Sequence, residues 1–136
     1  MKRTVLVDTG PLVALLDTRD GLHDRAMREL KLLRGELKVE VPVLVEAHLF
    51  LQSKALRARV VEAFARGSFI LGDAGVAERT RYALQWLERY AEHAPDFADG
   101  WVVAAADVER AAVWTFDSEF KSVWRTLSGK RIKLVP

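Results

Sequence analysis

The chain has 136 residues, which is enough for one compact domain with a buried core. Half of the residues are hydrophobic and 29% are charged, a balance that excludes a mainly disordered or fibrous chain, and the formal net charge of +2 excludes a general polycation. Cysteine is absent, which excludes disulfide scaffolds, thiolate metal sites and cysteine nucleophiles and favours the reducing cytoplasm.

Five short apolar or alternating segments are typical of β-strands. Asp8 ends the first of them, so the basic start of the chain lacks the apolar segment of a secretion signal. No apolar run elsewhere approaches the roughly 18 residues that span a bilayer. In the second segment, Lys38 and Glu40 alternate with apolar residues and predict one wetter face. The predicted strands are residues 4–7, 37–41, 68–71, 111–116 and 132–135.

Apolar residues at helical spacing predict helices between these strands. Gly35 stands where a left-handed cap would end the second helix, and Pro42 suits the first turn of the third. Asp73 and Asp96 are expected to cap two later helices. The predicted helical stretches are residues 12–16, 21–34, 42–52, 60–66, 74–92, 97–110 and a short one from 117.

Strands that alternate with helices predict right-handed β-α-β crossovers and a mostly parallel sheet covered by helices. No repeat, low-complexity segment or linker divides the sequence, so we expect a single domain over residues 1–136. In such a sheet, ligands bind at the edge formed by the carboxyl ends of the strands. Asp8 and Asp117 each follow a predicted strand directly, and Glu46 lies about one helical turn beyond another. These acids are therefore expected at the same edge.

Asp96 and Asp99 add two acids in the first turn of one predicted helix. Taken singly, an aspartate at such a junction is most often only a cap. Glu46 and Asp99 are harder to explain in that way, because both lie among apolar residues where an unpaired carboxylate is costly to bury. Several carboxylates at one edge repel one another unless a cation lies between them. Oxygen ligands favour Mg²⁺ or Mn²⁺, and the chemistry they indicate is phosphoester hydrolysis.

Nearly the whole sequence resembles the PIN-domain ribonucleases, and specifically the VapC-like toxins of bacterial and archaeal toxin–antitoxin pairs. The resemblance rests on four blocks, with further likeness at Trp124, Arg125 and the closing residues 134–136. The blocks are residues 5–17 (VLVDTGPLVALLD) with Asp20 and His23 downstream, 43–47 (VLVEA), 95–99 (PDFAD) followed by Val102, Val103 and Ala104, and 115–117 (TFD) followed by Phe120.

The resemblance implies a three-layer α/β/α sandwich, Mg²⁺- or Mn²⁺-dependent RNA cleavage, homodimerisation and inhibition by a small VapB-like antitoxin. Thr9 and Thr115 would steady the site by hydrogen bonding. Gly100 departs from the family's pattern at a helix penalty of about 1 kcal/mol against alanine, and Asp107 also departs from it. The acids that the resemblance assigns to metal coordination or catalysis are Asp8, Glu46, Asp99 and Asp117, with Asp96 as an auxiliary.

Other polar and aromatic residues have less specific interpretations. The three histidines lack ligand-like spacing and are expected to be structural, with His48 in the core or an interface. The four tryptophans are expected to pack in the core or a dimer, and only Trp124 is also a candidate for RNA contact. The basic candidates for phosphate contact are Arg19, Lys54, Lys121 and Arg125.

Three alternative functions are weighed against the nuclease. The tripeptide Asp8-Thr9-Gly10 occurs in retroviral-type aspartic proteases, but those need two copies on all-β halves. A phosphoacceptor receiver domain has a similar parallel α/β fold, but it needs adjacent acids after the first strand and a late lysine, which this sequence lacks. A PIN-like module that binds RNA or an antitoxin without cutting stays open.

Overall fold

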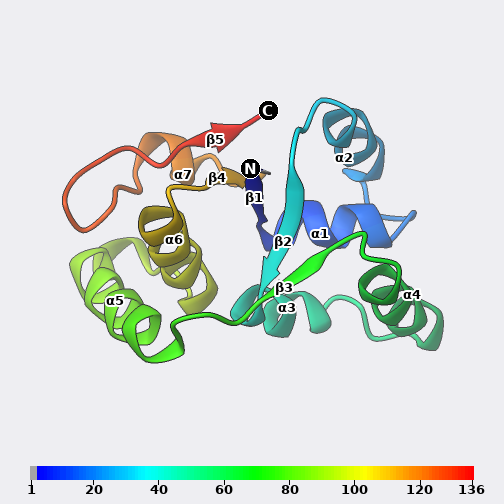
Figure 1. Cartoon of the computed structure of the whole chain (residues 1–136), viewed down its shortest axis with the longest axis horizontal. Helices are drawn as coiled ribbons and strands as arrows, with labels where there is room; N and C mark the ends of the chain where they lie inside the picture. Colours follow the sequence, from blue (N-terminus) through cyan, green and yellow to red (C-terminus); the bar gives the residue numbers. More distant parts are fainter. Residues whose placement is uncertain (1–2) are drawn as a thin grey trace.

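The computed structural model describes residues 3–136, and its centre is a five-stranded parallel sheet with β1 in the middle (Figure 1). The strands are β1 (Thr4–Val7), β2 (Glu36–Glu40), β3 (Ile70–Gly72), β4 (Ala112–Trp114) and β5 (Leu134–Val135). Their order across the sheet is β3-β2-β1-β4-β5. The predicted parallel sheet is therefore confirmed. The last two strands are shorter than predicted, because residues 115–116 leave the sheet and β5 pairs with β4 over two residues only.

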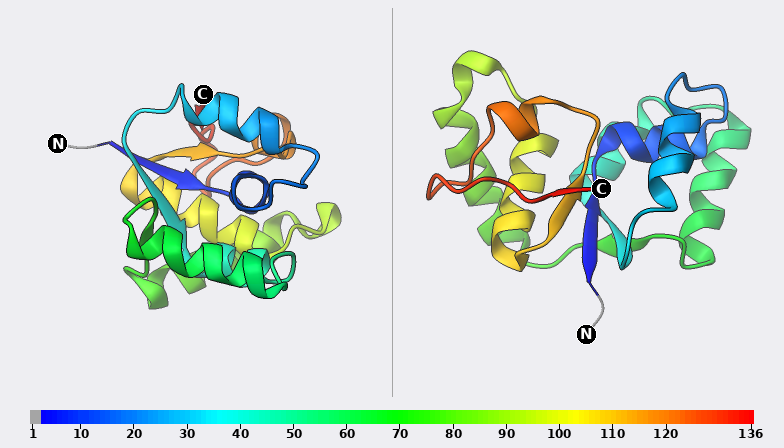
Figure 2. Two further views of the ribbon diagram at one scale, coloured as in Figure 1. Left: turned by 90° about the vertical axis from the view of Figure 1, so that its right-hand side faces the viewer. Right: turned by 90° about the horizontal axis from the view of Figure 1, so that it is seen from above.

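Helices cover both faces of the sheet. The helices are α1 (Thr9–Leu16), α2 (His23–Leu30), α3 (Val41–His48), α4 (Lys54–Ala65), α5 (Val76–Arg89), α6 (Phe97–Glu109) and α7 (Glu119–Ser122), with a 3-10 turn over Ala91–His93. Helices α5, α6 and α7 lie on one face, and α1 to α4 lie on the other (Figures 1 and 2). The predicted α/β/α sandwich is confirmed, and the all-β aspartic protease is excluded.

Strand β1 and helix α6 form the centre of the core. Val5, Leu6 and Val7 are at most 3% exposed, and α6 buries eight residues between the sheet and α5. Val7 pairs with Trp114, so the chain leaves β1 and β4 at neighbouring points. We call this side of the sheet, where β1, β2 and β4 end, the carboxyl edge, and the opposite side the amino edge.

Two close approaches between elements depend on glycine. At Gly100, an added Cβ would lie only 3.2 Å from the Ala83 carbonyl oxygen and 3.3 Å from the Trp86 ring. The glycine that departs from the family's pattern therefore lets α6 lie close against α5. At Gly35, φ is +117° and an added Cβ would collide with the Arg3 carbonyl, which accepts a hydrogen bond from the Glu36 backbone N–H at 2.7 Å. Glycine is required there to join β2 to β1.

That role corrects the prediction that Gly35 caps a helix. Helix α2 ends at Leu30, and Gly35 lies in the following connection. The predicted cap at Asp73 is also wrong, because α5 begins at Val76 after a left-handed Gly75 with φ +60°. The predicted cap at Asp96 is confirmed. Gly35 and Gly75 both have positive φ angles, so glycine determines where β2 and α5 begin.

The spacing of apolar residues predicts inward-facing stripes that the structure confirms only at the partly buried Leu87. The predicted stripes are Val45, His48, Leu49 and Gln52 for α3, and Leu84, Leu87 and Ala91 for α5. On α3, Val43 and Ala47 are buried, whereas Val45, Leu49 and His48, which is predicted to lie in the core or an interface, are exposed. His48 is thus not a core residue. On α5, Leu84 is exposed and the buried residues are Arg79, Ala83 and Trp86. In both helices the face next to the predicted one packs inward.

A buried ion cluster was missed entirely. Glu40, expected on a wetter face, is 1% exposed and accepts hydrogen bonds from Arg79 at 2.6 Å and from the Trp101 indole N–H at 3.2 Å. Arg79 also pairs with Glu109 at 2.7 Å, and Lys38 pairs with Glu109 at 2.5 Å. The cluster joins β2, α5 and α6 with two positive and two negative charges, so its members balance one another.

The remaining predictions concern the four tryptophans and the other two histidines. All four tryptophans are at most 4% exposed, as predicted, so Trp124 is a core residue and cannot offer its ring to RNA. His23 has a structural role, because its Nδ1 donates to the Ala14 carbonyl at 2.6 Å. His93 packs edge-on against the Trp124 ring. Within residues 3–136, no helix is long and apolar enough to cross a membrane.

Candidate functional site at the carboxyl edge

A cavity of about 350 Å³ opens at the carboxyl edge and collects the predicted acids. Asp8 reaches it from the end of β1, Glu46 from α3 and Asp117 from the segment after β4. Asp96 and Asp99 reach it from the start of α6. Four segments that are far apart in the sequence therefore meet at one point. Among the described residues, no lysine, arginine or histidine lines this cavity.

Asp8 is held at the bottom of the site by strand ends. Its side chain is 7% exposed, and it accepts a hydrogen bond from the Thr115 hydroxyl at 2.7 Å. The same hydroxyl accepts the Asp117 backbone N–H at 3.0 Å, so Thr115 links the two aspartates. Burial, and to a smaller extent the charges of Asp117 and Asp96, raise the pKa of Asp8 to about 6 against the lowering effect of the hydrogen bonds from Thr115 and the Thr9 backbone.

Asp96 and Asp99 cap α6 reciprocally. Asp96 Oδ1 accepts the Asp99 N–H at 2.9 Å, and Asp99 Oδ2 accepts the Asp96 N–H at 3.1 Å. This capping box uses one oxygen of each carboxylate and leaves the other outside it. Burial and then the neighbouring Asp96 and Asp8 charges raise the pKa of Asp99 to about 8. The cap and the site thus share both residues.

Glu46 and Thr9 complete the acidic wall. Burial and the neighbouring Asp96 carboxyl raise the pKa of Glu46 to about 7. Thr9 is buried and lies near enough to Glu46 to lower that pKa, but in residues 3–136 its Oγ1 meets no partner at hydrogen-bond geometry. A buried hydroxyl without a partner is uncommon in folded proteins, and a bound water or ion is one group that satisfies such an atom. The predicted hydrogen bond from Thr115 is present, and that from Thr9 stays a prediction.

The donor set fits a hard divalent cation. All the polar side chains that line the cavity offer oxygen, and no basic side chain lines it. Burial and neighbouring carboxylates raise the pKa values of Asp8, Glu46 and Asp99. Across residues 3–136, however, no three acidic or histidine side chains are already gathered as a ready ligand set. The carboxylates share one cavity and would need side-chain movement to share one ion.

Six further residues line the cavity without having been assigned a role, and the polar and aromatic ones among them are Asp20, Phe50 and Phe116. Asp20 belongs to the first block of the sequence, and its Oδ1 accepts the Leu22 N–H at 2.8 Å. Phe116 packs over Gly10, and Phe50 is 61% exposed at the rim. The position of Asp20 within the motif was the available signal. None of the predicted phosphate contacts lines the cavity, namely Arg19, Lys54, Lys121 and Arg125.

Solved structures of toxins share this fold. VapC20 of Mycobacterium tuberculosis, described as a sarcin-ricin loop cleaving toxin, is 24% identical, with a TM-score of 0.74 over 87% of this chain and 93% of that one. VapBC2 of Rickettsia felis, solved with a promoter DNA fragment, is 18% identical, with a TM-score of 0.67 over 96% of each chain. DNA-bound VapBC of Salmonella typhimurium is 22% identical, with a TM-score of 0.60 over 98% of each chain. At these identities the likeness shows the fold.

The sequence itself decides the family. Among curated proteins no sequence matches the chain. The family model described as "PIN domain" matches residues 5–125, which include every acid of the cavity. This match sets aside the receiver-domain alternative. The chain belongs to the PIN-domain family.

Proposed function

We propose that the protein is a Mg²⁺- or Mn²⁺-dependent endoribonuclease and the toxin of a toxin–antitoxin pair. The observation that carries the proposal is the meeting of acids from four separate segments on one cavity without a basic side chain. Such a cluster costs folding free energy and has no evident structural purpose beyond the α6 cap. Membership of a nuclease family and the fold shared with VapC toxins support the same conclusion.

The acids of the cavity have two roles in the proposed mechanism. Asp8, Glu46, Asp99 and Asp117 would hold the ion, with Asp96 as an auxiliary acid. A bound Mg²⁺ or Mn²⁺ supplies a water of lowered pKa and shields the phosphate charge. Thr115 fixes the orientation of Asp8 through its 2.7 Å hydrogen bond. Because the pKa values of Glu46 and Asp99 lie near 7 and 8 in the metal-free protein, these carboxyls would release protons as they bind the ion.

The proposed partners follow from the neighbours and from the surface. Structures of the same fold were solved as VapBC assemblies, which supports a VapB-like antitoxin for this chain. On α3 and just after it, Val45, Leu49 and Phe50 are 61–65% exposed, an apolar surface that suits the antitoxin or a second copy in a homodimer. RNA is the proposed substrate, and the reducing cytoplasm is the proposed compartment.

The proposal is tested by RNA cleavage with purified protein. We expect EDTA to abolish cleavage and Mn²⁺ or Mg²⁺ to restore it, and Asp8→Asn combined with Asp99→Asn to reduce the rate roughly 100-fold or more. Asp73→Asn is the control, since it makes the same kind of substitution and removes one carboxylate charge from an exposed position outside the cavity. Equal cleavage by the double variant would overturn the site. A folded wild-type protein that binds RNA but never cuts it would favour the non-cutting PIN-like module.

A further inference from the structure

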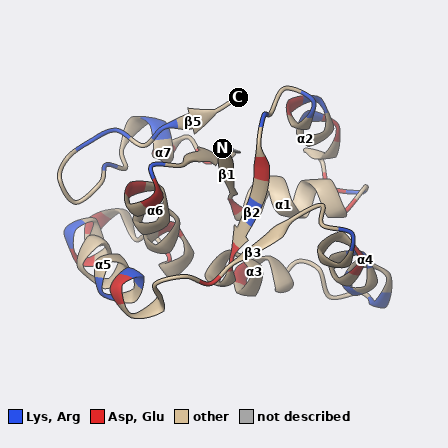
Figure 3. Ribbon diagram, viewed as in Figure 1, with Lys and Arg blue, Asp and Glu red and all other residues tan. Residues whose placement is uncertain are grey.

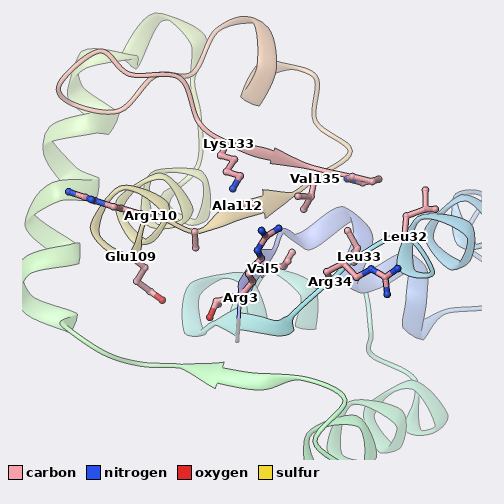
Figure 4. Close-up of a pocket in the computed structure, with 13 residues that line it drawn as sticks. Arg3, Val5, Leu32, Leu33, Arg34, Glu109, Arg110, Ala112, Lys133 and Val135 are labelled. Atoms are coloured by element: carbon pink, nitrogen blue, oxygen red, sulfur yellow. The ribbon is translucent and has the colours of Figure 1, made fainter. Parts of the chain in front are cut away.

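A second and larger cavity, of about 610 Å³, lies at the amino edge of the sheet, opposite the acidic site (Figure 4). It is bounded by the first residues of β1 and β4, by the connection between α2 and β2, and by the end of α6. The segment that leads into β5 closes the remaining side. Its volume falls in the range of cavities that hold small organic ligands. Nothing in the proposed nuclease mechanism uses it.

The charged side chains that line this cavity are mostly basic. They are Arg3, Arg34, Arg110, Lys133 and the single acid Glu109. Glu109 is already engaged with Arg79 at 2.7 Å and with Lys38. In the part of the chain that the structure describes, none of the four basic residues forms an ion pair. For a chain with a net charge of +2, this is a large uncompensated local charge.

Two of the cations are directed into the opening. Figure 4 shows the side chains of Arg3 and Lys133 extending toward one another, Arg3 from the start of β1 and Lys133 from the segment before β5. The Arg110 side chain points away from the opening in the same view. Figure 3 shows further basic residues along the segment between α7 and β5. A guanidinium and an ammonium group that face one opening form a natural receptor for a phosphate group.

The rest of the wall is apolar. Val5, Ala111 and Ala112 are buried residues at its floor, and Leu32, Leu33 and Val135 line it beside the cations. A phosphate ion alone would leave this apolar surface and most of the volume unused. A flat heterocyclic base joined to a phosphate matches both parts of the lining.

We propose that the amino-edge cavity binds a nucleoside phosphate, with the phosphate between Arg3 and Lys133 and the base against Leu32, Leu33 and Val135. The ligand is either a free nucleotide or the phosphorylated terminal nucleotide of an RNA strand, because the two present the same chemistry. The acidic cavity at the opposite edge repels phosphate when no divalent ion is present. Binding measured in EDTA therefore reports the amino-edge cavity, independently of any nuclease activity.

The test is isothermal titration calorimetry of the full chain in EDTA at low salt, with adenosine 5′-monophosphate as the probe. We expect Arg3→Ala combined with Lys133→Ala to weaken binding about tenfold or more. Both side chains are exposed, so the fold does not depend on them. Arg57→Ala, which removes one cation from an exposed face of α4 outside the cavity, is expected to leave the affinity unchanged.

Further probes separate the two sources and the possible failures. A short RNA with a 5′-phosphate that binds more tightly than the same RNA without it would identify a strand end as the ligand, whereas tighter binding of the free nucleotide would identify a metabolite. Inorganic phosphate that binds as well as the nucleotide would overturn the nucleoside assignment. Absence of nucleotide binding, or undiminished binding by the double variant, would overturn the proposal and leave the carboxyl-edge nuclease untouched.

Discussion

The two edges of the sheet carry opposite charges and are built in different ways. At the carboxyl edge, six acids line a cavity of about 350 Å³, and Asp8 and the α6 cap are fixed by hydrogen bonds. At the amino edge, basic side chains on exposed chain segments line a cavity of about 610 Å³. The net charge of +2 conceals this separation. Local charge, and not the total, therefore predicts which ligand each edge accepts.

The edges also differ in what they cost the fold. The cations at the amino edge remain hydrated, whereas carboxylates at the carboxyl edge are partly removed from water and placed beside one another. Raised pKa values of Asp8, Glu46 and Asp99 express that cost. A site that strains the protein in this way is typical of catalysis or metal binding.

The largest expected effect concerns the ion cluster between the two edges. Arg79→Ala leaves Glu40 buried without its 2.6 Å partner and is expected to lower the free energy of unfolding by about 3–5 kcal/mol. Arg66→Ala removes an exposed pair with Glu62 on α4 and is expected to cost less than about 1 kcal/mol. Urea denaturation measures both. Equal losses would show that the buried cluster contributes no more to stability than an exposed ion pair does.

The next effect tests the electrostatic cost of the carboxyl edge through pH. Since Asp8, Glu46 and Asp99 have folded pKa values above their unfolded ones, the folded state binds more protons between about pH 4 and 8, and metal-free stability falls as pH rises through that range. Asp8→Asn removes a shift from 3.8 to about 6, so we expect a gain of at most about 3 kcal/mol at pH 8 and none at pH 4.

Thermal melts in EDTA at the two pH values measure this gain, and Asp73→Asn is again the matched control. We also expect Mn²⁺ to raise the melting temperature of the wild type more at pH 8 than at pH 5, because protons and the cation compete for the same carboxylates. A wild-type protein whose metal-free stability rises from pH 4 to 8 would contradict the account of a strained acidic edge.

Much of the carboxyl edge was predictable from sequence, because strand ends and helix caps are local patterns. Asp8 and Asp117 follow apolar runs, and parallel pairing brings such positions together whatever lies between them. The capping pair Asp96 and Asp99 is visible in its three-residue spacing. Whether these acids bind a metal is not decided by the same patterns.

The rest depends on tertiary packing. The sequence pattern predicts that Glu40 faces solvent. In the fold, Arg79 and Trp101 from distant helices donate hydrogen bonds that compensate for the burial of its carboxylate. The same holds for α3, where the exposed Val45 and Leu49 carry as strong an apolar signal as the buried Val43. The amino-edge cavity has no motif, because Arg3, Arg34 and Lys133 meet only after the sheet has formed.

The smallest effect tests how Thr115 tunes the acidic edge. In the wild type, the 2.7 Å hydrogen bond from Thr115 lowers the pKa of the Asp8 carboxyl. Thr115→Val keeps the shape of the side chain but removes this hydrogen bond. We therefore expect the pKa of Asp8 to rise further above 6, measured by NMR titration of its carboxyl carbon, with a stability loss of about 1–2 kcal/mol. Thr80→Val removes a hydroxyl that bonds only within α5 and is expected to leave the Asp8 titration unchanged. If both variants leave it unchanged, Thr115 does not set the charge of Asp8, and burial alone distinguishes this carboxylate from the exposed charges of the amino edge.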